Sequence, residues 1–251
     1  MPRLLDENMV TGQVGNNFKF SAIKTTALGA SEYTLVNIGV DITGSVSGFE
    51  KELKQSVVAA VDACKKSPRA DNLLVRVFLF HSSLPNNGME EIHGFKPLSE
   101  IDTATDYPDF QTGGATNLYD AAYACVGSSH EYAKQLTKDD FPNNIINIII
   151  TDGEDNRSVM SPGAVKKAIG DLVKSEDSES CINILVGVND TNCQSALDRF
   201  KNEGGFDTYI PTGDVTPAKL AKLANFISQS ISSQSQSLGT GGPSKTIAAT
   251  I

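Results

Sequence analysis

Four apolar runs divide the chain, and each has the composition of a strand that is buried on both faces. They are residues 33–41 (YTLVNIGVD), 72–82 (NLLVRVFLFHS), 144–151 (NIINIIIT) and 181–188 (CINILVGV). The segments between most of these runs carry apolar residues three or four positions apart, which is the period of an amphipathic helix. Strands that alternate with helices in this way predict a mostly parallel sheet covered by helices on both faces.

The remaining segments complete the expected fold. NNGMEEIHGF indicates a turn into a short antiparallel strand, and FDTYI indicates a last short strand. We therefore expect a doubly wound α/β fold with a six-stranded, mostly parallel sheet and one antiparallel edge strand. Residues 1–32 are expected to be an N-terminal extension in which FKFSAIKTTAL is an edge strand or hairpin, residues 33–231 the domain, and residues 232–251 a flexible C-terminal tail.

Composition narrows the class of partner and the compartment. The 251 residues carry a formal net charge of -9, which argues against nucleic acid or an anionic membrane as a partner, because both attract basic surfaces. The N-terminus lacks the apolar core of a signal peptide, no run approaches the roughly 20 apolar residues that span a bilayer, and the four cysteines show no CxxC spacing. These features predict a cytoplasmic protein with reduced thiols.

Oxygen-bearing side chains follow the strand ends. Asp41 closes the first run and is followed by Thr43 and Ser45, and Asp152 comes directly after the most apolar run. Thr116 follows a Gly-Gly turn at an expected helix start. In open sheets of this type, ligands bind beyond the carboxyl ends of the strands where strand order reverses. Two carboxylates and three hydroxyls form an all-oxygen set that suits a hard cation such as Mg²⁺.

The same residues carry a resemblance to a known family. DITGS, TGGATNLYDA and IIITDGED resemble the three loops of the von Willebrand factor A domain, whose metal-ion-dependent adhesion site is written D-x-S-x-S, then Thr, then Asp. Asp41, Thr43 and Ser45 correspond to the first loop, Thr116 to the second and Asp152 to the third. Thr43 departs from the pattern, because the family usually has Ser there; the hydroxyl is retained, but the added methyl restricts its rotamer.

The resemblance covers residues 33–231 in element order and implies binding rather than catalysis. It implies that Mg²⁺, or else Mn²⁺ or Ca²⁺, leaves one coordination position open for a Glu or Asp of a partner protein. Intracellular members of the family often work beside AAA+ ATPases, in chelatases or in tellurium-resistance stress clusters. FISQSISSQSQS is similar to the end of the tellurium-resistance group. These features predict an adaptor that is not an enzyme.

Other functions remain as alternatives. The site is vestigial if the chain is a structural or assembly protein that makes its contacts through the N-terminal arm or the tail. A metal-dependent phosphotransferase of the haloacid dehalogenase type needs a second Asp where Thr43 stands, and so lacks its general acid/base. GTGGPSKT, at residues 239–246, nearly matches a nucleotide-binding loop, but no buried strand precedes it and no helix can follow.

Overall fold

A computed structural model of the chain describes residues 7–214 and 216–240, which form one mixed sheet with helices packed against it. Within these residues the sheet has eight strands in the order β1-β2-β5-β4-β3-β6-β7-β8. The strands are β1 (Met9–Val14), β2 (Phe18–Ile23), β3 (Tyr33–Asp41), β4 (Leu73–Phe80), β5 (Met89–Pro97), β6 (Asn143–Thr151), β7 (Ser180–Gly187) and β8 (Thr208–Pro211). All four apolar runs of the sequence are therefore strands of this sheet, as expected.

The centre of the sheet is parallel and fully enclosed. β3 pairs in parallel with β4 on one side and β6 on the other, β6 pairs in parallel with β7, and β7 with β8. Every residue of β3, β4 and β6 is buried, which explains why these strands are mostly apolar and do not alternate regularly with polar residues.

Two features of the expected sheet are wrong. The sheet has eight strands in place of six, and the antiparallel strand β5 lies inside the sheet, because β2 pairs with it in parallel on the side away from β4. β1 and β2 form an antiparallel hairpin, which confirms the interpretation of FKFSAIKTTAL and brings part of segment 1–32 into the sheet. Helix α6 (Pro217–Thr240) continues into the segment expected to be a tail, and residues 241–251, with most of the GTGGPSKT motif, lie outside the described residues.

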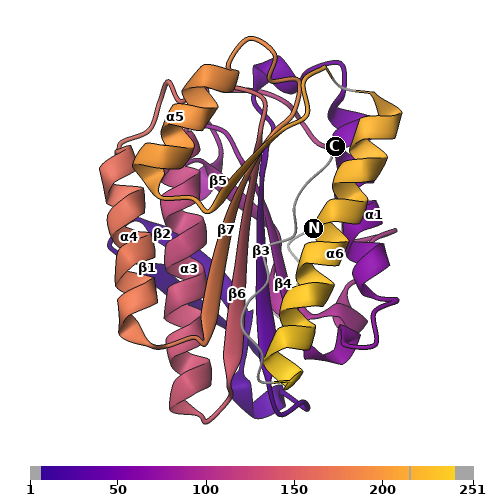
Figure 1. Cartoon of the computed structure of the whole chain (residues 1–251), viewed down its shortest axis with the longest axis vertical. Helices are drawn as coiled ribbons and strands as arrows, with labels where there is room; N and C mark the ends of the chain where they lie inside the picture. Colours follow the sequence, from indigo (N-terminus) through magenta and orange to yellow (C-terminus); the bar gives the residue numbers. More distant parts are fainter. Residues whose placement is uncertain (1–6, 215, 241–251) are drawn as a thin grey trace.

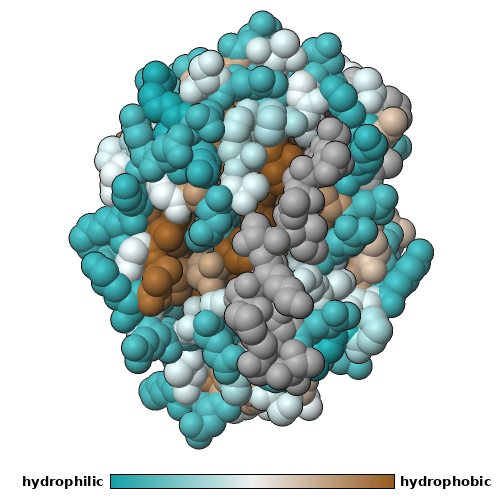
Figure 2. Space-filling model, in the orientation of Figure 1, coloured by the Kyte–Doolittle hydropathy of each residue, from teal (hydrophilic) through white to brown (hydrophobic). Residues whose placement is uncertain are grey.

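The helices form two layers. Figure 1 shows α6 and α1 (Glu50–Cys64) on one side of the sheet, and α3 (Leu118–Lys138), α4 (Pro162–Ser175) and α5 (Gln194–Gly204) on the other. A short turn of helix, α2 (Pro85–Gly88), precedes β5. The surface in the same view is mostly hydrophilic, as the net charge of -9 leads us to expect, with hydrophobic areas toward the middle (Figure 2).

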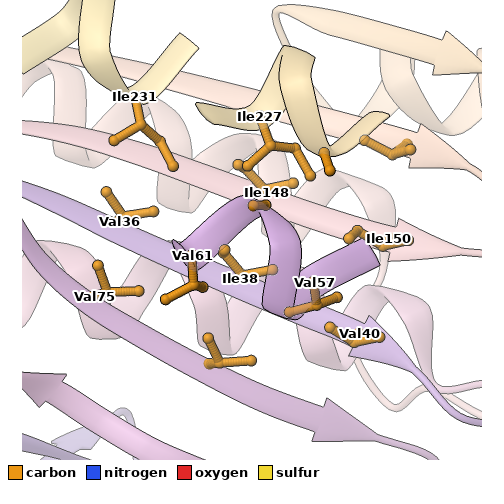
Figure 3. Packing of buried hydrophobic residues seen from close by; sticks show 14 of the residues in the cluster. Val36, Ile38, Val40, Val57, Val61, Val75, Ile148, Ile150, Ile227 and Ile231 are labelled. Carbon is orange, nitrogen blue, oxygen red and sulfur yellow. The ribbon is translucent and has the colours of Figure 1, made fainter. Parts of the chain in front are cut away.

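Each helix layer encloses its own apolar core, because successive side chains of a strand point to opposite faces. In the core under α1 and α6, alternate residues of β3 pack against Val57 and Val61 of α1 and Ile227 and Ile231 of α6 (Figure 3). Among the described residues, no helix is both long and apolar enough to cross a membrane. All four cysteines are free thiols.

Helix α3 runs without a break through Gly127, although glycine weakens a helix interior. A Cβ at this position would lie 2.2 Å from Cγ1 of Val14 in β1, so the glycine allows the hairpin to pack closely against α3. We expect Gly127→Ala to lower the free energy of unfolding by about 1–3 kcal/mol through overpacking. Gly170→Ala in α4, with no atom within 4 Å of its new methyl, should raise it by up to about 1 kcal/mol. Urea unfolding of both variants tests this, and equal effects would contradict it.

Candidate metal centre

The strand order brings the sequence-predicted site residues to one end of the sheet. Asp41 is the last residue of β3, and Asp152 follows the last residue of β6. Since β3 and β6 are adjacent and parallel, their carboxyl ends lie side by side. The chain leaves β3 for β4 on one side of β3 and later enters β6 on the other, so this is the point where the strand order reverses.

Hydrogen bonds join the first and third loops directly. The Ser45 hydroxyl donates to Oδ1 of Asp152 at 2.9 Å, and Oγ1 of Thr43 lies 3.0 Å from Oγ of Ser45. Thr43, the departure from the family pattern, thus turns its hydroxyl toward the other oxygens and is almost fully buried. The first loop also contacts the second, because the backbone N–H of Gly113 donates to the carbonyl of Ile42 at 3.0 Å.

Thr116 is held by its backbone on both sides. Its N–H donates to Oδ1 of Asn156 at 2.9 Å, and its carbonyl accepts from the backbone N–H groups of Asn156 and Arg157, each at 3.0 Å. A Cβ at Gly153 would lie 3.9 Å from Oγ1 of Thr116, which places this hydroxyl beside the turn that follows Asp152. The loops of all five candidate residues therefore meet at the carboxyl ends of β3 and β6.

Asp41 is completely buried, and its two oxygens have separate partners. Oδ1 accepts from the backbone N–H of Thr43 at 2.9 Å, and Oδ2 accepts from the Thr151 hydroxyl at 2.7 Å. Burial, reinforced by the neighbouring charge of Asp152, raises the pKa of Asp41 to about 7. Burial also raises the pKa of Asp152, against the opposing effect of the Ser45 hydrogen bond.

This donor set fits a hard divalent cation. Two carboxylates whose ionised forms are disfavoured by burial gain from a neighbouring positive charge, and the hydroxyls of Thr43, Ser45 and Thr116 supply further oxygen donors. In the described part of the chain, no group of three or more His, Cys, Asp or Glu side chains is placed to hold a metal. A nitrogen- or sulfur-rich zinc site is therefore absent from that part, whereas the mixed carboxylate and hydroxyl set is present.

Sequence reasoning missed the residues that orient this set. Thr151 lies within the IIITDGED motif and Asn156 directly follows it, and that position was the one available signal. The Asp155 carboxylate accepts from the backbone N–H of Tyr119 in the first turn of α3 at 3.1 Å. Ser47 precedes the start of α1, and its Oγ lies 2.8 Å from the Thr112 hydroxyl.

Comparisons with known proteins give similarities of fold alone. No protein-family model matches the chain, and no curated protein does. Among solved structures it is similar to the pilus adhesin SpaC of Lactobacillus rhamnosus GG, with a TM-score of 0.57 and 10% identity over 90% of this chain. It is also similar to the minor pilin PilB of Streptococcus sanguinis, with a TM-score of 0.53 and 15% identity over 89% of this chain.

The chain spans 34% of the SpaC chain and 66% of the PilB chain, so it corresponds to part of each. Proximal thread matrix protein 1 of the mussel byssus, solved with a zinc-occupied MIDAS motif, has a TM-score of 0.49 at 15% identity and matches 80% of this chain and 46% of its own. Together with the observed sheet, the similarities to SpaC and PilB show a shared α/β fold and nothing beyond the fold.

Proposed function

We propose that the chain is a metal-dependent protein-binding domain of the von Willebrand factor A type. Its site holds Mg²⁺, with Mn²⁺ and Ca²⁺ as alternatives, through Asp41, Thr43, Ser45, Thr116 and Asp152. The observation that carries this proposal is the linked set Thr43–Ser45–Asp152, in which the Ser45 hydroxyl lies 3.0 Å from the Thr43 hydroxyl of its own loop and 2.9 Å from the Asp152 carboxylate of another.

The bound ion supplies a positive charge and an open position for a carboxylate of the partner protein. The residues of this chain prepare that site. The Thr151 hydroxyl and the Thr43 N–H fix both oxygens of Asp41, and the two backbone anchors of Thr116 hold its loop beside Gly153. A charge-assisted contact of this kind anchors an otherwise neutral interface. Thr43 stands where a phosphotransferase of the haloacid dehalogenase type needs an Asp as its general acid/base. The activity that we propose is therefore binding and not this catalysis.

The names of the similar solved structures, a pilus adhesin and a minor pilin, agree with a role in protein interaction. The partner is proposed to offer a Glu or Asp side chain. A cytoplasmic location, an AAA+ ATPase partner and a tellurium-resistance context remain predictions from the sequence resemblance.

A second candidate is an assembly protein with a vestigial metal site. It is favoured by the hydrogen bond between Ser45 and Asp152, which gives each of these side chains a partner within the chain. Recovery of the same partners with and without EDTA in pull-down experiments would support this candidate against metal-dependent capture.

Calorimetric titration with Mg²⁺ and Mn²⁺ tests the metal site. We expect the wild type to bind and Asp152→Asn to lose at least about tenfold in affinity, because it removes one of two carboxylates from the ion. Glu154→Gln is the matched control, since it removes an exposed carboxylate two residues away that lies outside the set. Equal affinities of the wild type and Asp152→Asn would refute the site.

A further inference from the structure

The loop that follows Asp152, residues 153–160, is fixed to the first turn of α3 by its backbone. The carboxylate of Asp120 accepts from the N–H groups of Val159 and Met160, with Oδ1 at 3.1 Å and 2.8 Å respectively. The carboxylate of Asp155 accepts from the N–H of Ser158 at 3.2 Å as well as from Tyr119. With the two bonds from Asn156 and Arg157 to the carbonyl of Thr116, five consecutive N–H groups of the loop donate inward.

Arg157 and Val159 are two of the exposed residues of this ordered loop. Arg157 is exposed, and among the described residues no acidic side chain forms an ion pair with it. Val159 is 86% exposed, one of two large hydrophobic side chains in the described residues to stand out in this way. The backbone N–H groups of Asn156 and Arg157 donate to the carbonyl of Thr116. The side chains of Arg157 and Val159 therefore project from the same loop backbone that positions a candidate metal ligand.

We propose that Arg157 and Val159 are a second contact point for the partner, which is a protein segment with two acidic side chains and an adjacent apolar one. One carboxylate of the segment binds the metal, the second pairs with the Arg157 guanidinium, and the apolar side chain packs on Val159. This inference rests on the proposed function. The planar guanidinium suits a carboxylate, and the ordered loop loses little entropy on binding.

The charge of the loop limits where the second acid lies. Glu154 is exposed in the same loop and repels a carboxylate placed near it. The second acid of the partner is therefore expected on the Arg157 side of the metal, away from Glu154. Since the N–H groups of residues 156–160 are already bonded, the loop recognises the partner through side chains and not by adding a backbone strand.

The test uses the full chain and a series of capped synthetic peptides, each with one Leu. One peptide has a single Asp, and the others have two Asp residues separated by one, two or three Gly residues. Binding is followed by NMR chemical-shift titration in Mg²⁺ and in EDTA. In Mg²⁺ we expect one of the two-Asp peptides to bind about 3–10 times more tightly than the peptide in which its second Asp is Asn. Arg157→Gln should reduce this ratio to about one, and Val159→Ser should weaken binding of every Leu-containing peptide about 2–5 times.

The matched control is Lys167→Gln, which removes an exposed cation of α4 that pairs with Asp171. It should leave the two-Asp preference unchanged. Two outcomes with metal-dependent binding would overturn the inference and leave the proposed function standing. In the first, no spacing of the two Asp residues gives tighter binding than one Asp. In the second, the two-Asp preference survives Arg157→Gln. Peptide binding that is equal in Mg²⁺ and EDTA would overturn the proposed function itself, and this inference with it.

Discussion

Asp41→Asn is expected to make the metal-free protein more stable at pH 8 while abolishing its response to Mg²⁺. Asp41 is fully buried beside Asp152, and its pKa is raised from 3.8 to about 7. The folded state therefore holds a proton on this group over a pH range in which the unfolded chain has released it. Stability contributed by this group is highest below pH 4 and falls as the pH rises toward 7, where Asp41 must ionise in a buried site.

The size of the effect follows from the pKa shift, at about 1.4 kcal/mol for each pH unit over which the two states differ in protonation. The penalty at pH 8 is thus on the order of a few kcal/mol, and a neutral Asn avoids it. The fold accommodates Asn, because the Thr151 hydroxyl can accept from its amide and donate to the carbonyl of Gly153, which lies 3.2 Å away.

Mg²⁺ should reverse the order of stability, so that the wild type becomes more stable than Asp41→Asn. An ion that binds only the folded state stabilises the wild type by about 2.7 kcal/mol at one hundred times its dissociation constant, and it stabilises Asp41→Asn not at all. Thermal unfolding at pH 8 in EDTA and in Mg²⁺ measures this. Glu154→Gln serves as the control and should follow the wild type in both conditions. A wild type that is the more stable protein in EDTA, or unchanged by Mg²⁺, would contradict the prediction.

Glu91→Ala should lower the free energy of unfolding by about 3 kcal/mol, because it leaves a buried cation without its counter-ion. Arg76, in the middle of β4, is 1% exposed, and its Nε donates to Oε1 of Glu91 at 2.5 Å. Its Nη1 donates to Oδ1 of Asn37 at 3.0 Å, and its guanidinium lies 4.4 Å from the ring centroid of Phe78. Those neutral contacts cannot replace the carboxylate charge.

Glu91 also ties the hairpin to the rest of the sheet. Its Oε2 accepts from the Ser21 hydroxyl at 2.6 Å, and the Ser21 N–H donates to both carboxylate oxygens at 3.1 Å. Glu91→Ala should therefore loosen β2 from β5 as well, which hydrogen exchange of β2 would detect as faster exchange.

Chemical unfolding of Glu91→Ala, Glu91→Gln and Arg76→Met tests the account. Glu91→Gln keeps one of the two acceptor oxygens and should lose less than Glu91→Ala, and Arg76→Met removes the buried charge and should also lose less. Glu131→Ala, which removes an exposed carboxylate paired with Lys134, should change stability by under about 1 kcal/mol. A cost for Glu91→Ala no larger than that of Glu131→Ala would show that Arg76 needs no counter-ion.

Local patterns in the sequence were sufficient to predict most elements. The apolar runs became β3, β4, β6 and β7. Helix α4 begins at Ser161-Pro162, a pair that favours a helix start, and the Ser161 hydroxyl accepts from the N–H of Ala164 at 3.3 Å. Residues that end strands were also predictable as members of one set, because parallel neighbours place their carboxyl ends at the same edge.

The strand count was not predictable in the same way, because the contacts that place the hairpin join residues far apart in the chain. β2 is bonded to β5 through Glu91, 70 positions from Ser21. It is bonded to α2 through Asn86, whose side-chain amide bonds both the N–H and the carbonyl of Lys19 at 2.8 Å. Neither acid nor amide looks like a sheet-forming residue in the sequence, so nothing in segment 1–32 indicated that it would move β5 from the edge to the interior.

The sequence by itself therefore determined the α/β alternation and the identity of the oxygen-bearing side chains at the strand ends, since both depend on neighbours only a few residues apart. The tertiary structure decided the strand order, the partners Thr151 and Asn156, and the raised pKa of Asp41. These depend on burial and on charges brought together across more than one hundred residues, as Asp41 and Asp152 are. A carboxylate acquires such a pKa only when folding removes its water and places a second carboxylate beside it.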